Sequence, residues 1–350
     1  MMPNVAIVYL SYNGISYLDE VIAALRALDY PKDRLELIVV DNASHDGSQD
    51  YLRNVEGVTL FLNEENVVFA EGNNIGMRHA IEQGAVYVFL HNNDLILDPA
   101  AIKESVACAE SDPSIGSVQS LMLLWKHRDI VNSTGGMIHF LGFGFVRDNG
   151  KKWEHCAVQD RETIAYASGA AVLYRVRVLQ EIGLLDPFLF LYHEDLELGW
   201  RIRLAGYRNV LSINSRAYHD YEFKRSVSKF FWMERNRWLV HFSHLKWPTL
   251  ILLVPWMLLL EFPLMVFAVV GGWGTEKFRV YRALLQPRCW NYVAQKRKQS
   301  QQIRRVTDRV ILSEFTSKIQ HQETSSVVVD SIGNPVLTRL WRCIYWLVRW

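Results

Sequence analysis

Short apolar runs and helix-like segments alternate through the first 100 residues of the chain, and this alternation constrains the fold more than any other feature. Such alternation predicts an α/β fold whose mostly parallel sheet is covered by helices on both faces. Ligands of such sheets bind beyond the carboxyl ends of the strands. The patterns predict strands at Val5–Leu10, Leu35–Val40, Val58–Leu62 and Val86–Leu90, and helices at 15–28, 48–53 and 76–83.

The stretch from Val86 to Pro99 shows what the end of one predicted strand carries. Apolar residues run directly into His91-Asn92-Asn93-Asp94, and the chain then becomes apolar again. An isolated ionised carboxylate is too costly to bury unpaired, so either this end reaches solvent or Asp94 holds a ligand. A carboxylate facing the ligand crevice can hold Mg²⁺ or Mn²⁺, which prefer oxygen ligands and keep open positions for substrate phosphates. Asn92 is placed to bond a ribose.

Two other segments carry polar groups at the same predicted edge. Asp41 and Asn42 end the second strand in VDNASHDGS, where they can bond a nucleobase or a ribose. Turn and helix-cap chemistry explains the same residues equally well. In NEENVVFAEGNNIGMRHA, Gly72, Asn73 and Gly76 lead into the predicted helix, whose free N–H groups can hold a phosphate or ribose. Glycine and asparagine also form ordinary loops, so both interpretations stay open.

A further polar cluster, His193-Glu194-Asp195, stands just before a predicted helix at 196–205. One of its carboxylates can act as a general base. Alternatively, acidic residues in a first helical turn simply interact favourably with the helix dipole. Upstream, the pattern of residues 168–182 predicts a strand followed by a helix. The segment 120–163, rich in glycine and aromatic residues, shows no readable periodicity.

The composition changes at Pro248, and 248–272 is almost entirely apolar, with Glu261 as its one charge. The length suffices for a membrane span, but Pro255 and Pro263 should kink or break a helix. Basic residues predominate on both flanks, a mark of the cytoplasmic side, so both ends are expected there. We therefore favour a bent, re-entrant or interfacial segment over a span or a buried helical hairpin. Tryptophans suited to an interface lie at Trp247, Trp256 and Trp273.

The composition excludes several classes of protein. The net charge of +1 argues against a nucleic-acid partner, and the four cysteines form no CxxC pair that would indicate a zinc site or a disulfide scaffold. No GxGxxG follows the first strand, which argues against a dehydrogenase.

Taken in order, the motifs resemble family 2 glycosyltransferases with the GT-A fold, a Rossmann-like, mostly parallel central sheet flanked by helices. The matches are SYNG, VDNASHDGS, Asn63 with EGNNIG, NND, SGAAVLYR and HEDLELGWRIRLAGY, which cover residues 4–240. The rhamnosyltransferase-like branch, whose members build lipid-linked glycans, is the most similar. We expect a catalytic domain at 1–240, with a nucleotide-sugar half at 1–115 and an acceptor half at 116–240. A membrane-associated helical region is expected at 241–350.

The resemblance implies roles for individual residues. Asp195 would be the catalytic base, with Glu194 as the lesser candidate. Asp94 stands where the family carries its DxD metal motif, and His219 matches a histidine that completes the metal site in some relatives. Arg235 and Arg237 can hold an acceptor diphosphate, or form a solvated or lipid-facing basic helix face. Residues expected to bind the nucleotide sugar are Ser11, Asn13, Asp41 (at the base), Asn73, Asn92, Asn93, Ser168 and Gly169.

The expected reaction is inverting transfer of one sugar from a dTDP-, UDP- or GDP-sugar to a hydroxyl of a lipid-linked glycan. It would use Mn²⁺ or Mg²⁺ at a membrane surface, with the catalytic domain in the cytoplasm. Processive members of the family carry a QxxRW motif. The sequence of this chain contains none, so transfer of a single sugar is expected. Two alternatives are a sugar nucleotidyltransferase, which the missing Gly-rich phosphate loop after strand one disfavours, and an inactive membrane scaffold.

Overall fold

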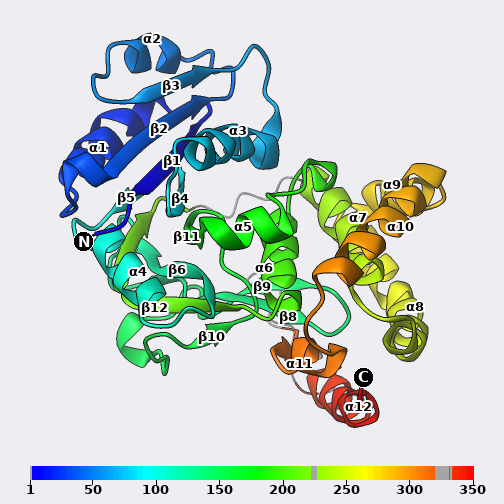
Figure 1. Cartoon of the computed structure of the whole chain (residues 1–350). Helices are drawn as coiled ribbons and strands as arrows, with labels where there is room; N and C mark the ends of the chain where they lie inside the picture. Colours follow the sequence, from blue (N-terminus) through cyan, green and yellow to red (C-terminus); the bar gives the residue numbers. More distant parts are fainter. Residues whose placement is uncertain (1, 222–226, 320–330, 332) are drawn as a thin grey trace.

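The computed structural model describes residues 2–221, 227–319, 331 and 333–350. Its centre is a ten-stranded sheet with the path β10-β12-β6-β11-β4-β1-β2-β3, to which β5 and β7 are attached (Figure 1). The predicted strands are confirmed as four parallel neighbours, and antiparallel β11 joins them to the second half of the sheet. The strands are β1 (Val5–Ser11), β2 (Leu35–Asp41), β3 (Thr59–Leu62), β4 (Tyr87–Asn92), β5 (Leu95–Leu97), β6 (Ile115–Leu124), β7 (Val131–Ser133), β10 (Thr163–Ile164), β11 (Ala171–Arg175) and β12 (Arg208–His219).

Helices cover this sheet on both faces, as the alternation of patterns predicts. Strand β1 is buried throughout. Its residues Val5, Ile7 and Tyr9 belong to one core cluster, and Ala6, Val8 and Leu10 belong to the other, because side chains alternate along a strand. The α/β fold class is therefore confirmed. The helices of this part are α1 (Ile15–Arg26), α2 (Ser48–Arg53), α3 (Val68–Glu82), α4 (Ala101–Glu110), α5 (Val176–Ile182) and α6 (Glu194–Leu204), with short 3₁₀ turns at Lys32–Arg34, Trp153–His155 and Pro187–Leu189.

The segment without readable periodicity contains short strands that belong to two sheets. Strand β7 pairs with β6, whereas β8 (Gly136–His139) and β9 (Gly144–Val146) form a hairpin in a separate three-stranded sheet. The third strand of that sheet is β13 (Phe315–Thr316), which lies beside β8. The C-terminal region is thus tied by strand pairing to the middle of the chain.

Helix α3 begins eight residues earlier than predicted, and this changes the interpretation of its glycines. Gly72, Asn73 and Gly76 are buried inside the helix instead of marking its start. A Cβ at Gly76 would lie 2.5 Å from Cγ1 of Val8, and one at Gly72 would lie 2.6 Å from Cδ1 of Leu10. These glycines therefore permit close packing of the helix on β1, and the predicted anion-binding helix start at this point is wrong.

The C-terminal helices are α7 (Val227–His244), α8 (Trp247–Val270), α9 (Gly274–Leu284), α10 (Pro287–Ile303), α11 (Asp308–Leu312) and α12 (Asn334–Leu347). The prolines are expected to kink or break a helix; α8 continues through Pro255 and Pro263, so neither proline breaks it. A proline removes one N–H from the hydrogen-bond ladder, and the turns on either side keep theirs. Among the described residues, α8 is the one helix long and apolar enough to cross a membrane.

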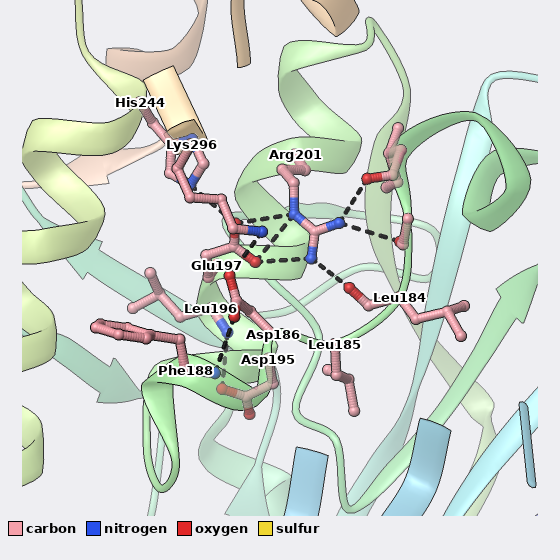
Figure 2. Close-up of polar contacts among 12 residues, drawn as sticks. Leu184, Leu185, Asp186, Phe188, Asp195, Leu196, Glu197, Arg201, His244 and Lys296 are labelled. Atoms are coloured by element: carbon pink, nitrogen blue, oxygen red, sulfur yellow. Dashed lines mark hydrogen bonds and ion pairs between the residues drawn. The ribbon is translucent and has the colours of Figure 1, made fainter. Parts of the chain in front are cut away.

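A buried ion pair between two residues for which the sequence predicted no role fixes helix α6. Arg201 and Glu197 are one turn apart and buried, with Nη2 of Arg201 2.7 Å from Oε2 of Glu197 (Figure 2). Arg201 also donates to the carbonyls of Ile182, Gly183 and Leu184, and the other oxygen of Glu197 lies 3.1 Å from Nε2 of His244. This network joins α6 to the end of α5 and to α7.

Replacing Gly76 by alanine should destabilise the protein by about 1–3 kcal/mol, because the new methyl group would overlap Val8 in a packed interface. Helix propensity alone predicts the opposite sign, a gain of about 1 kcal/mol. Chemical denaturation of the Gly76→Ala variant measures the difference. Glu82→Ala, at an exposed position near the end of the same helix, is the control and should change stability little. A stabilised Gly76→Ala variant would contradict the packing role.

Replacing Arg201 by methionine should cost about 3–5 kcal/mol, since it leaves the buried Glu197 carboxylate without its cation. The exposed pair Arg53–Asp50, whose charged atoms are 2.6 Å apart, offers a matched comparison. Arg53→Met should cost less than about 1 kcal/mol. Equal losses in the two variants, measured by denaturant unfolding, would show that burial of the first pair does not matter.

Candidate active site

Two predicted metal-binding side chains, Asp94 and His219, meet where strands end. Antiparallel pairing of β5 with β12 sets Leu95 opposite His219, so the residue before Leu95 lies beside the histidine ring. Oδ1 of Asp94 is 3.1 Å from Nε2 of His219. The structure thus brings together two residues that are 125 positions apart in the chain.

The hydrogen bonds of His219 suit it to bind a cation. Its Nδ1 lies 3.0 Å from Oδ1 of Asn132, and an amide oxygen only accepts, so Nδ1 carries the proton. With the proton on Nδ1, Nε2 is free to ligate a divalent ion held beside the Asp94 carboxylate. Within the described ranges no group of three or more His, Cys, Asp and Glu side chains gathers around a possible metal position. The remaining ligands of an ion here would come from water and substrate oxygens.

The predicted nucleotide-binding residues Ser11 and Asp41 lie opposite each other at the ends of β1 and β2. The Asp41 carboxylate is fully buried and already accepts hydrogen bonds from protein groups: the N–H and hydroxyl of Ser44, and the side-chain amide of Gln49. Asn13 accepts from the N–H of His45, with its own N–H donating to Ser44. The Asp41 carboxylate is therefore already hydrogen-bonded within the turn. A nucleobase that bound here would contact these neighbouring groups as well as Asp41.

The other asparagines divide between the strand ends and the helix interior. Asn92 donates its backbone N–H to the carbonyl of Ala170, and Asn93 donates its side-chain amide to the carbonyl of Tyr12. Both therefore lie at the edge where β4 ends. Asn73 is buried in α3 and donates its side-chain amide to the carbonyl of Phe69 in the same helix.

The candidate base is held beside the start of β11. Oδ2 of Asp195 accepts from the N–H of Gly169 at 3.2 Å, and Oδ1 accepts from the N–H of Leu196 at 2.7 Å. A Cβ at Gly169 would lie 2.9 Å from the ring of Phe69, so only glycine allows this approach. The preceding Ser168 donates its N–H to Gln119. Because Ala170 contacts Asn92, the Asp94 and Asp195 segments share one end of neighbouring strands.

The electrostatics separate the roles of the two adjacent acids. Burial and the charge of Asp195 raise the pKa of Glu194 to about 8, so its carboxyl group is protonated near neutral pH. Burial also raises the pKa of Asp195, but the N–H groups of Gly169 and Leu196 oppose that shift. Asp195 is therefore the better candidate for a base, as the resemblance implies, and Glu194 the poorer one.

The structure places Arg235 and Arg237 outside this group. Arg235 is buried and donates to the carbonyls of Phe188 and Leu189. Arg237 is buried in ion pairs with Glu234 and Glu261. Neither guanidinium group is available for a diphosphate in this arrangement, and neither forms a solvated or lipid-facing helix face.

Pattern analysis missed Asn132 and Gln119, which orient His219 and the Ser168 backbone. Asn132 lies in the segment without periodicity, and Gln119 lies inside a buried strand, so no local signal distinguished either residue.

The model of the family "Glycosyltransferase like family 2" matches residues 3–240. The chain is 25% identical over 183 residues to the cellulose synthase catalytic subunit [UDP-forming] of Pseudomonas fluorescens, a match covering 49% of this chain and 24% of that protein. The chain thus spans about a quarter of the length of that relative.

Two solved structures share the fold. GalNAc-T7 with UDP, GalNAc and Mn²⁺ has a TM-score of 0.57 at 16% identity, covering 70% of this chain and 49% of the other. S. aureus TarS in complex with UDP-GlcNAc has a TM-score of 0.52 at 15% identity, covering 98% of this chain and 88% of the other. With the family model matching more than half of its length, the chain belongs to glycosyltransferase family 2.

Proposed function

We propose that the chain transfers a single sugar, with inversion, from a nucleotide sugar to a hydroxyl of a lipid-linked glycan acceptor. The observation that carries this proposal is the pair of acidic positions, Asp94 beside His219 and Asp195 beside Gly169, at one end of neighbouring strands. The order of the sequence motifs supports the rhamnosyltransferase-like branch. The bases of dTDP, UDP and GDP donors all remain candidates for binding at the strand ends near Asp41.

In this proposal Asp195 takes the proton from the acceptor hydroxyl, which attacks the anomeric carbon from the face opposite the leaving group. The carboxylate needs only to be ionised and correctly oriented. The hydrogen bonds that it accepts from two backbone N–H groups favour the ionised form and fix its orientation. Asp94 and His219 would hold Mn²⁺ or Mg²⁺, whose charge stabilises the departing nucleoside diphosphate. Ser11, Asn13, Asn92, Asn93 and Ser168 line the same edge and are proposed to contact the donor.

We further propose that the enzyme works at the cytoplasmic surface of a membrane through α8. One face of this helix packs on the protein with Leu250, Leu253 and Met257, and the opposite face exposes large apolar side chains along its whole length. The exposed fraction reaches 76% for Phe262 and 82% for Val270. Exposed apolar area of this extent is unusual for a surface that meets only water.

The contacts of α8 favour a helix that lies in the membrane plane over one that spans the bilayer. Glu261 is paired with Arg237 of α7 and Lys277 of α9, the latter at 2.7 Å. Helix α9 packs on both α7 and α8 and carries the exposed charge of Arg279, so it does not belong in hydrocarbon. A helix held against such neighbours would place its apolar face in the headgroup and acyl boundary.

The donor site is tested by thermal stabilisation of the detergent-solubilised protein by UDP, GDP or dTDP, with and without Mn²⁺ or Mg²⁺. We expect one nucleotide to raise the melting temperature in a metal-dependent way, because only the folded state binds it. Asp94→Ala should abolish this effect, whereas Asp33→Ala, an exposed acid just before the start of β2 and so at the opposite end of that strand, should preserve it. Folded wild-type protein that no nucleotide stabilises would contradict the proposal.

The membrane orientation is tested on vesicles containing anionic lipid. Phe262→Glu should weaken binding at least about tenfold, since burial of such a side chain contributes about 1.5–3 kcal/mol. Val86→Glu, at an exposed apolar position beside β4, should bind as wild type does. For topology, Lys246→Cys and Thr275→Cys are made in a background with Cys156 and Cys343 replaced by serine. A membrane-impermeant thiol reagent should label both from the side of addition; labelling of one alone would indicate a span.

A further inference from the structure

The segment that presents the candidate base has a strained backbone. Phe190, Tyr192 and His193, with φ of 67°, 62° and 71°, lie in the left-handed region within four consecutive positions. None is glycine, and each such residue costs on the order of 1–3 kcal/mol. Such a conformation persists only where surrounding contacts enforce it. The segment leads directly into Glu194 and Asp195 at the start of α6.

Helix α7 supplies those contacts through the amide of Asn236. Its Nδ2 lies 2.8 Å from the carbonyl oxygen of Leu189, 3.1 Å from that of Leu191 and 2.8 Å from that of Tyr192. The residue is completely buried, so no water competes for these bonds. One side chain thus holds carbonyls on both sides of the strained Phe190.

Arg235 extends the same contact. Its Nη2 donates to the carbonyls of Phe188 and Leu189, at 2.8 and 3.1 Å. The guanidinium group also donates through Nε and Nη2 to Oδ1 of Asn236, which orients the amide with its N–H groups toward the segment. It lies over the ring of Trp232, 4.5 Å from the centroid, and over Phe188.

The start of the segment is anchored separately. Asp186 accepts from the N–H of Phe188, and its carboxylate lies 2.6 Å from Nζ of Lys296 (Figure 2). It also accepts from the hydroxyl of Tyr292. The segment is therefore fixed at its beginning by α10, along its length by α7 and at its end by α6. Asn236 is the contact that acts where the backbone is strained.

We propose that Asn236, oriented by Arg235, is a positioning residue that holds residues 188–193 in the strained conformation which aims Asp195 at the acceptor. This inference rests on the proposed function of Asp195 as the base. A displacement of about 1 Å at a reacting group can reduce the rate on the order of a hundredfold, so loss of this clamp should reduce turnover while leaving the donor site intact.

The test compares Asn236→Ala with a matched buried asparagine. Asn209 is also fully buried and donates to two carbonyls, those of Ala165 and Gly199, each at 2.9 Å, but it does not hold the segment before Asp195. Asn236→Asp is the second variant, because it keeps the shape and the acceptor for Arg235 and removes the N–H donors. Asn209→Ala should lose stability to a similar extent, which separates positioning from general destabilisation.

Two readouts are measured on the full chain in detergent. Hydrogen–deuterium exchange in peptides covering 187–196 should quicken at least about tenfold in both Asn236 variants and stay unchanged in Asn209→Ala. Nucleoside diphosphate release from UDP-GlcNAc or GDP-mannose, with Mn²⁺ and a membrane lipid extract as acceptor source, should fall about a hundredfold in the Asn236 variants. Their stabilisation by nucleotide and Mn²⁺ should match that of wild type.

Unchanged exchange in Asn236→Ala would overturn the clamp, and this readout needs no turnover. Turnover of the Asn236 variants within threefold of Asn209→Ala would overturn the positioning role even if exchange quickens. Asp195→Asn provides the separate check on the proposed function. If Asp195→Asn retains the wild-type rate, Asp195 is not the base, whereas its inactivity together with active Asn236 variants rejects the clamp alone.

Discussion

Four consecutive polar residues of α7, Glu234 to Arg237, are buried, and the need to satisfy them organises the second half of the molecule. A buried charge is tolerated only when it is paired or hydrogen-bonded. Glu234 and Arg237 meet this need through Lys277 and Glu261, which fixes α7 to α8 and α9. Arg235 and Asn236 meet it through the backbone carbonyls of the segment before Asp195.

The same helix therefore contacts both the apolar helix α8 and the segment that carries the candidate base. Under the proposed function, this arrangement would link two requirements of an enzyme whose acceptor lies in a membrane. The proposed catalytic carboxylate would have to be held accurately, and the body of the enzyme would have to be held near the lipid surface. The ion pairs of Glu261 with α7 and α9 fix one side of α8 and leave its opposite, apolar face exposed, as the second requirement would need.

Sequence patterns located the candidate site well where strands end and poorly where helices begin. Apolar runs followed by polar residues indicated Asp41 and Asp94, because the carboxyl ends of parallel strands share one edge. Gly72 and Gly76 are predicted to precede a helix, but they lie inside it. They permit close contact of the helix with Leu10 and Val8. Arg235 and Arg237 carried the charge suited to a diphosphate, but charge in a sequence does not reveal which partner a fold supplies.

By itself the sequence determined the alternating α/β architecture, the motifs of family 2 and the apolar character of 248–272, because these depend on local periodicity and composition. Tertiary structure alone decided that His219 meets Asp94, that Asn132 sets the tautomer of the ring, and that α8 continues through its prolines. It also decided that Asn236 bonds the backbone of the strained segment that precedes Asp195. Each of the side-chain contacts joins segments far apart in the chain, and no local pattern encodes a contact whose partner is set by the packing of the whole molecule.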